Sequence, residues 1–140
     1  MVVGSPEGRQ LGRLEYTADQ LSSVRHAVRG MVLGLDAGLD KTRAEDVVLA
    51  VHEVAVNSVL YGAGSARLSV WEDGQQLTFE IENRRNSASA PVLRTPTADQ
   101  VSGRGLWLAR HLVDDLAVEV TPDNVTVRLH LARARSSPAG

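Results

Sequence analysis

The clearest pattern along this chain of 140 residues is an amphipathic repeat between Thr42 and Tyr61. Its apolar residues recur at steps of three and four, which is the period of one face of an α-helix. They are Ala44, Val47, Val48, Val51, Val54, Ala55 and Val59. Thr42 and Glu45 are spaced as a capping box, and Gly62 can end the helix. The sequence therefore predicts a helix over 42–61 whose apolar face packs against the rest of the molecule.

A narrow polar strip lies roughly opposite this apolar face. At about 100° per residue, Asp46, Glu53 and Asn57 share the strip, and apolar residues border it on both sides. A solvated surface is the ordinary interpretation of such residues, but a solvated surface would carry more charge at its borders. The alternative is a cleft, in which Glu53 is suited to accept a proton and the amide oxygen of Asn57 is suited to bind Mg²⁺.

The rest of the chain divides into short alternating segments and two further helical segments. Thr17 and Gln20 are spaced as another capping box, ahead of the first helix. Strands are expected at 11–16, 66–71, 77–82, 116–121 and 125–131, and the two further helices at 17–33 and 106–116. Turn residues at 73–74 and 122–124 indicate two hairpins. This order of elements predicts an α+β two-layer sandwich, in which a mixed, mainly antiparallel sheet carries helices on one face.

Composition mainly excludes classes of function. One domain is expected at 10–132, between disordered ends at 1–9 and 133–140. The 15 Lys and Arg against 17 Asp and Glu argue against charge-driven binding to nucleic acid or to a membrane surface. The chain has no cysteine, no signal peptide and no apolar stretch that could span a bilayer, so a cytoplasmic protein is expected. The four histidines lack metal-ligand spacing, and His52 points away from the polar strip, so none is assigned a role.

A glycine pair follows a long stretch without a periodic pattern. From Asn83 the alternation is lost for about twenty residues, a length typical of a lid or a binding loop. Gly103-Arg104-Gly105 then leads into the last predicted helix. Glycines at a helix start let backbone amides approach an anion closely, and the helix dipole adds to the attraction. The pair therefore predicts a phosphate site over which Arg104 could close, although glycine before a helix is also ordinary loop chemistry.

Three of these features together resemble the ATP-binding fold shared by sensor histidine kinases, DNA gyrase and their relatives, the GHKL fold. They are E-x-x-x-N on the central helix, a hairpin that ends in a long loop, and G-x-G-L at the following helix. The resemblance covers residues 10–132, and AVHEVAVNSVLYG is its most specific string. Because no phosphoacceptor-histidine helices precede the domain, the chain is most similar to the bacterial anti-sigma factors that are also serine kinases.

The resemblance implies a role for each matching residue. Glu53 would be the catalytic base on the serine hydroxyl of a partner protein. Asn57 would be the magnesium ligand beneath the phosphates. The segment Gly103 to Leu106 would hold the phosphates while residues 83–102 fold over them. The implied cofactor is ATP or ADP with Mg²⁺, and the implied chemistry is phosphoryl transfer by positioning and charge neutralisation.

The implied adenine site departs from the family pattern. The family usually has an aspartate, followed two residues later by glycine, at the end of the second hairpin strand. Here these positions hold Asn83 and Arg85. An asparagine oxygen can still accept one hydrogen bond from adenine, but without the assistance of a charge. Arg85 also brings a long side chain where the family leaves space for the purine.

The leading hypothesis is an anti-sigma factor that binds a sigma factor and, if ATP is bound, phosphorylates a serine on an anti-sigma-factor antagonist. The alternative is a degenerate GHKL module that binds proteins without ATP or kinase activity. The altered adenine site favours this alternative, and the intact Glu53 and Asn57 oppose it. A third hypothesis is a catalytic domain that acts on a separate histidine-containing partner. The resemblance also implies a homodimer, and Arg25 and Arg29 on the first helix are a candidate partner surface.

Overall fold

The computed structural model describes residues 8–34, 40–73, 76–85 and 101–132. The expected disordered ends, apart from residues 8 and 9 which it describes, and most of the expected lid, at 86–100, lie outside these ranges. Within them the chain forms one sheet, three α-helices and one short 3₁₀ turn.

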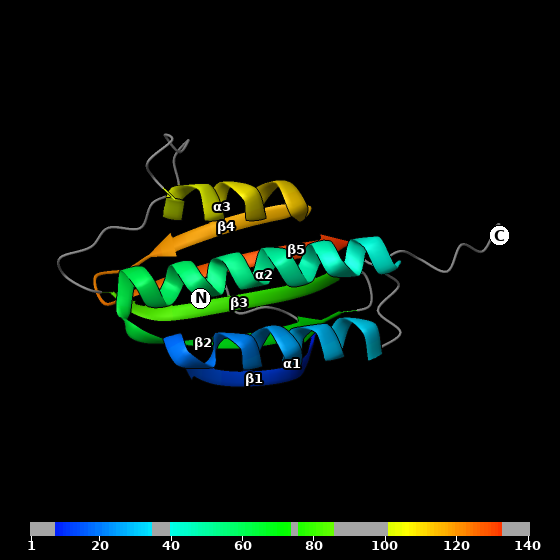
Figure 1. The fold of residues 1–140 in the computed structure, drawn as a ribbon, viewed down its shortest axis with the longest axis horizontal. Helices are drawn as coiled ribbons and strands as arrows, with labels where there is room; N and C mark the ends of the chain where they lie inside the picture. The colour runs from blue at the N-terminus through cyan, green and yellow to red at the C-terminus, as the bar shows by residue number, and fades with distance from the viewer. Residues whose placement is uncertain (1–7, 35–39, 74–75, 86–100, 133–140) are drawn as a thin grey trace.

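A five-stranded antiparallel sheet forms one layer of the molecule (Figure 1). Its strands are β1 (Arg9–Thr17), β2 (Gly62–Glu72), β3 (Gln76–Arg85), β4 (Asp115–Val120) and β5 (Asn124–Ala132). Their order across the sheet is β1-β2-β3-β5-β4. Each neighbouring pair is antiparallel, which confirms the predicted sheet. Both predicted hairpins are present, β2 with β3 and β4 with β5.

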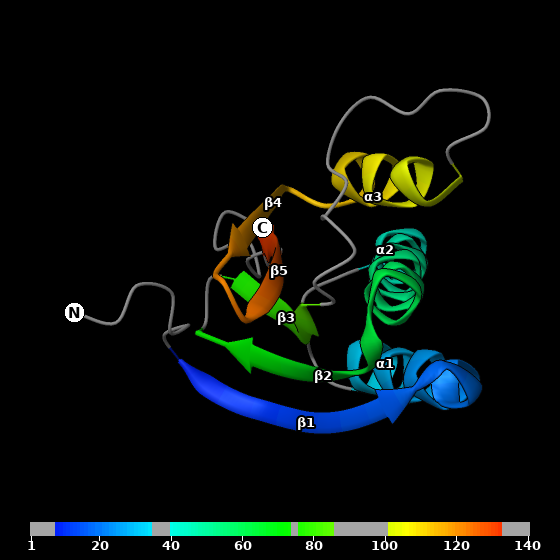
Figure 2. The ribbon, with the colours of Figure 1, turned by 90° about the vertical axis from the view of Figure 1, so that its left-hand side faces the viewer.

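Three helices cover one face of this sheet, and no described helix lies on the other face (Figure 2). After the 3₁₀ turn η1 (Ala18–Gln20), the helices are α1 (Leu21–Gly34), α2 (Lys41–Tyr61) and α3 (Val101–Leu112). Helix α2 lies in the middle, between α1 and α3 (Figure 1). This arrangement confirms the two-layer α+β sandwich. None of the described helices is long and apolar enough to cross a membrane.

The core lies between the sheet and α2. Every second residue of β3 faces the helices, so Leu77, Phe79 and Ile81 are almost fully buried. All seven apolar residues predicted to form the inner face of α2 are buried as well. The three-and-four spacing of small apolar residues thus places one continuous side of α2 on the middle of the sheet.

The entrance to α1 agrees with the sequence-based prediction. The side-chain Oε1 of Gln20 accepts a hydrogen bond from the backbone N of Thr17, at 3.0 Å. The hydroxyl of Thr17 donates to Asp19, and this bond lowers the pKa of the Asp19 carboxyl. The chain then passes through the turn η1 before the α-helix begins.

The start of α2 differs from the prediction. Thr42 already lies inside the helix and cannot be its cap. The cap is Asp40, whose Oδ1 accepts a hydrogen bond from Arg43 N at 2.7 Å. Glu45 pairs with Arg29 of α1 instead, with 2.7 Å between Oε1 and Nη2. The predicted Thr42–Glu45 capping box is therefore wrong, because an aspartate two residues earlier supplies an equally good acceptor.

One aspartate fixes the position of α3 relative to α2. Asp114, just after the end of α3, forms an ion pair with Arg43 near the start of α2. Its Oδ2 also accepts a hydrogen bond from the backbone N of Ala132, at 2.6 Å, which ties both helices to the end of β5. The two helices consequently run antiparallel, and the start of α3 lies along the second half of α2 (Figure 1).

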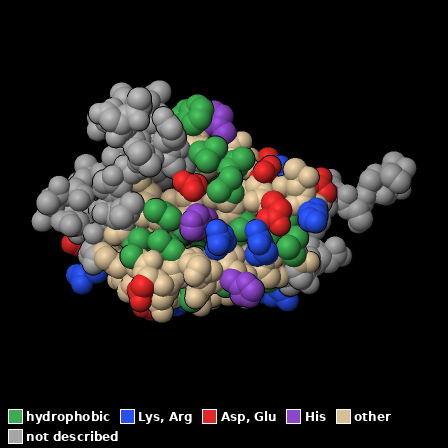
Figure 3. Space-filling model, in the orientation of Figure 1, with side chains coloured by type: hydrophobic (Ala, Val, Ile, Leu, Met, Phe, Trp, Pro, Cys, Tyr) green, Lys and Arg blue, Asp and Glu red, His purple; other side chains and the backbone are tan. Residues whose placement is uncertain are grey.

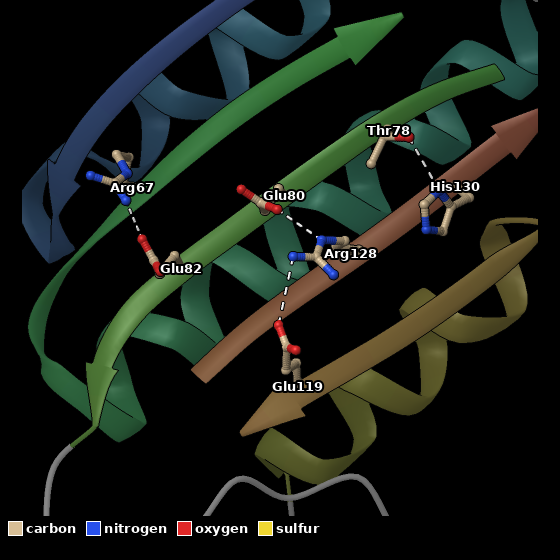
Figure 4. A network of polar contacts seen from close by, with 7 residues as sticks. All are labelled: Arg67, Thr78, Glu80, Glu82, Glu119, Arg128 and His130. Carbon is tan, nitrogen blue, oxygen red and sulfur yellow. Dashed lines mark hydrogen bonds and ion pairs between the residues drawn. The ribbon is translucent and has the colours of Figure 1, made fainter. Parts of the chain in front are cut away.

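The face of the sheet opposite the helices carries a paired polar network (Figure 4). The Nε of Arg128 in β5 lies 2.8 Å from Oε2 of Glu80 in β3. Its Nη2 lies 3.7 Å from Oε1 of Glu119 in β4. Arg67 of β2 pairs with Glu82 of β3, and the hydroxyl of Thr78 lies 3.1 Å from Nδ1 of His130. These contacts join neighbouring strands on the uncovered face.

Candidate functional site

The two flanks of α2 can be assigned from its ion pairs. Glu45 pairs with α1, and Arg43 pairs with the end of α3. On a helix of about 100° per residue, Asn57 lies within about 40° of Arg43 and about 120° from Glu45. Asn57 is therefore on the flank of α2 that faces α3.

Asn57 is buried, and its amide oxygen has no partner. The residue is 9% exposed. No hydrogen bond to its Oδ1 is found within the described part of the chain. An unpaired buried carbonyl oxygen costs about 1–3 kcal/mol, so such groups are rare unless a ligand, ion or water meets them. The orphaned oxygen fits the metal-ligand role that the sequence predicted for Asn57.

Glu53 and Asp46 share the polar strip with Asn57 but are half-exposed. Glu53 is one turn before Asn57, so the two side chains point in similar directions from successive turns. The prediction placed the strip roughly opposite the core. Asn57 is nevertheless buried, and it lies on the flank of α2 that carries the ion pair to the end of α3. The carboxylates therefore lie at the outer border of this buried flank.

Asn83 occupies the end of β3 on the side of the sheet that faces the helices. It pairs across the sheet with Ala66 and Val125 and is buried, at 6% exposed. Its Nδ2 donates a hydrogen bond to the carbonyl of Arg84 at 3.1 Å. Since β2 begins directly where α2 ends, the end of β3 lies at the same end of the molecule as Asn57.

The glycine pair lies inside α3 rather than ahead of it. The helix begins at Val101, so Gly103, Arg104 and Gly105 belong to its first turns. The side chains from 101 to 106, Leu106 included, lie outside what the structure describes. The expectation of a glycine turn that leads into the helix is therefore wrong in position. The start of α3, where backbone amides are free of intrahelical partners, still lies along the half of α2 that carries Asn57.

Some of the predicted site residues lie outside the part of the chain that the structure describes. Arg85 pairs in the sheet with Gly62, and its side chain is outside the described part. Residues 86–100 of the expected lid are outside it too. The position of Arg85 at the adenine site and the folding of the loop over the phosphates therefore stay predictions.

His52 lies on the flank of α2 toward α1, away from Asn57. Burial lowers the pKa of its imidazole; the carboxylate of Glu53 opposes this change, and the charge of Arg25 adds to it. Its Nδ1 has no partner within the described residues. Because His52 points about 140° away from Asn57 around the helix, it is not placed to act as a base there.

Sequence reasoning missed Tyr16, which holds α2 in place beside the site. Its hydroxyl donates a hydrogen bond to the carbonyl of Ala55 at 3.3 Å. Burial raises the pKa of this hydroxyl well above its usual value, and a hydrogen bond with Ser58 opposes the rise. The contact joins β1 to the turn of α2 that carries Asn57. Residues 39 positions apart leave no local signal of such a contact.

Comparison with solved structures shows the fold again. A Mycobacterium tuberculosis protein with RsbU and RsbW domains is 18% identical, with a TM-score of 0.62, over 86% of this chain and 32% of that one. This chain therefore spans about a third of the length of that structure. A chain of the SiaB–SiaC complex from Pseudomonas aeruginosa is 14% identical, with a TM-score of 0.67, over 88% of this chain and 90% of that one. No curated protein sequence matches the chain.

A family match covers most of the sequence. The histidine kinase-like ATPase domain matches residues 14–131, a range that contains α2, both hairpins and α3. It also agrees with the α+β fold of the described residues. The chain belongs to the histidine kinase-like ATPase domain family.

Proposed function

We propose that this protein is a cytoplasmic anti-sigma factor of the serine-kinase type. It would bind a sigma factor and phosphorylate a serine on an antagonist protein. The single observation that carries the proposal is the buried, unpartnered oxygen of Asn57, one turn from the half-exposed Glu53. A group that only stabilised the fold would have its oxygen paired.

ATP or ADP with Mg²⁺ is the cofactor in this proposal, and ATP would supply the phosphoryl group. The oxygen of Asn57 is a hard neutral ligand that suits Mg²⁺. The described residues contain no group of three His, Asp or Glu side chains that could hold a metal ion. Phosphate and water oxygens would therefore complete the coordination. The backbone of Gly103 to Gly105 would hold the phosphates, and Asn83 would accept a hydrogen bond from adenine.

Glu53 would act on the acceptor. Its side chain is half-exposed, so a partner protein can reach it from outside. A carboxylate within hydrogen-bond distance of a serine hydroxyl can orient that hydroxyl and accept its proton as the oxygen becomes the nucleophile. Because Asn57 is buried and Glu53, one turn earlier on the same strip, is only partly buried, successive turns of α2 would serve the metal and the acceptor.

The partners follow from the family resemblance, and the solved structures support partner binding in general. A chain of similar fold and length occurs in a two-protein complex, SiaB–SiaC. A second similar fold contains an RsbW domain together with an RsbU domain. A sigma factor, an antagonist and a second copy of this chain are the partners in the proposal.

The second candidate is a module of the same fold that binds partners without a nucleotide. The replacement of the usual aspartate and glycine by Asn83 and Arg85 favours it. The Nδ2 of Asn83 is already used by the carbonyl of Arg84, so this amide is held by a contact within its own strand.

Calorimetric titration with ATP and with ADP, each with Mg²⁺, tests the proposal. Micromolar binding is expected for the wild type. Asn57→Ala should weaken binding by about tenfold or more, because a lost ligand contact of 1.4 kcal/mol is already a factor of ten. Asn124→Ala, at the first residue of β5, is the matched control and should bind as the wild type does.

The opposite result is equally informative. If the folded protein shows no binding at millimolar nucleotide, the kinase proposal fails and the nucleotide-free module replaces it. Equal binding by the wild type and Asn57→Ala would mean that Asn57 does not hold the metal.

A further inference from the structure

Three parallel strips of different chemistry run along the outer surface of α2. Asp46 and Glu53 form the first strip, toward α3. At about 100° per residue, Leu49 and Val56 lie about 40–60° further round, toward α1. His52 lies beyond them, close enough to Arg25 of α1 for that charge to affect its pKa, after the larger effects of burial and Glu53. The order across the surface is acidic, apolar, basic.

The helix layer seen from outside agrees with this order (Figure 3). Lys, Arg and His side chains gather along the boundary between α1 and α2, and hydrophobic side chains lie beside them, over α2 and toward α3. Leu49 is 41% exposed although it lies in the middle of the longest helix. An exposed leucine alone is ordinary and does not indicate a binding surface. The position of Leu49 relative to Glu53 is more informative.

That position places Leu49 and Val56 one turn on either side of Glu53. They are the i−4 and i+3 neighbours, about 5–6 Å away between Cβ atoms. A serine hydroxyl that hydrogen-bonds to Glu53 must come within about 3 Å of the carboxylate. The residues next to that serine are only about 3.8 Å away along the acceptor backbone. Side chains next to the serine therefore come within reach of Leu49 or Val56.

Among the described residues, the basic strip has one arginine without an ion pair, beside the paired Arg29 and Glu45. Arg29 is engaged by Glu45. Arg25 is exposed and forms no ion pair within the described residues. An acidic residue of the acceptor, further from the serine on the side of α1, would find its counter-charge there. The two carboxylates of the first strip would repel the same residue on the other side.

We infer that Leu49, Val56 and Arg25 select the acceptor: it is a protein segment with an apolar residue beside its serine and an acidic residue beyond it, toward α1. This inference rests on the proposed function, because Glu53 sets where the serine lies. The apolar pair gives affinity by burial, and the cation sets the direction in which the segment crosses α2.

The test is selection from a phage-displayed library of seven-residue peptides with a fixed central serine, on the full chain and without nucleotide. We expect enrichment of apolar residues beside the serine and of Asp or Glu beyond it. Leu49→Ser should raise the Kd of the selected peptides about tenfold, because the leucine surface is no longer buried. Leu33→Ser is the matched control: Leu33 is 48% exposed, near the end of α1, and its loss should leave the Kd unchanged.

A charge reversal tests the direction. Arg25→Glu should weaken the binding of peptides that carry the acidic residue. It should strengthen the binding of peptides in which lysine replaces that residue. The absence of enrichment, or equal affinities for Leu49→Ser and Leu33→Ser, would overturn the inference. Because no nucleotide is present, a failure of ATP binding leaves this result interpretable, and a failure of selection leaves the test of ATP binding intact.

Discussion

The two halves of α2 are built differently. In the first half, polar side chains are paired: Asp40 caps the helix, Glu45 holds Arg29, and Arg43 holds Asp114. In the second half, the Oδ1 of Asn57 and the Nδ1 of His52 have no partner within the described residues. One half of the helix anchors the layer, and the other half keeps polar groups available. The proposed metal ligand thus lies in the half of α2 that has unpaired polar atoms.

The strongest test of the anchoring half is Asp114→Ala. It removes both the ion pair to Arg43 and the acceptor for Ala132 N. We expect the free energy of unfolding to fall by about 1–2 kcal/mol, since the pair itself is partly exposed and contributes little. Urea denaturation measures this. Asp114→Asn keeps the acceptor without the charge and should lose less; an equal loss would assign the effect to the charge.

Asp40→Ala should have the next largest effect. The change removes the side-chain oxygen that accepts from Arg43 N. The loss of such a cap lowers the free energy of unfolding by about 1 kcal/mol. Thr42→Ala is the control and should be nearly neutral, because Thr42 does not cap the helix. A larger loss for Thr42→Ala than for Asp40→Ala would restore the rejected capping box.

In the second half of α2, one substitution should raise the free energy of unfolding instead of lowering it. Asn57→Leu replaces an unpaired amide with an apolar side chain of similar size, and the free energy of unfolding should rise by up to about 1 kcal/mol. The matched control is Asn83→Leu, which should lower it, because Asn83 donates to the carbonyl of Arg84. Thermal denaturation of both variants measures these two changes in stability. If Asn57→Leu is clearly destabilising, the oxygen of Asn57 is paired in solution.

The smallest effect concerns pH. The pKa of His52 is lowered, mainly by burial, so the folded state binds fewer protons than the unfolded state below about pH 6.5. Stability should therefore fall as the pH drops through the unfolded pKa toward the folded one. His52→Gln should reduce this slope in urea titrations between about pH 5 and 7, with the exposed His26→Gln as control. An unchanged slope would show that His52 takes up its proton without cost.

Much of the candidate site could be predicted from sequence because it lies on one helix. The spacing of Glu53 and Asn57 needs only the period of α2, and the alternation of β3 places Asn83 toward the helices. The burial of Asn57 could not be predicted in this way. It depends on tertiary packing around α2, which the period of one helix does not determine.

The errors at helix ends have a similar cause. Two candidate caps, Asp40 and Thr42, lie two residues apart, and local propensity does not rank them. Gly103 and Gly105 are predicted to precede a helix, as a glycine turn whose amides approach an anion, yet both are helical in α3. Tertiary contacts such as those of Asp114 outweigh these local preferences. Such contacts cannot be predicted from the identity of a single residue.

Helix α2 passes into β2 without an intervening loop, since the helix ends at Tyr61 and the strand begins at Gly62. A rod joined directly to a ribbon cannot rotate about its own axis unless the ribbon twists with it. β3 pairs with β2 at Gly62 and from Ala66 onward, and β1 pairs with it from Ser65 onward. The sheet thus restricts rotation of α2 about its own axis, so the direction in which Asn57 points is set before any ligand binds.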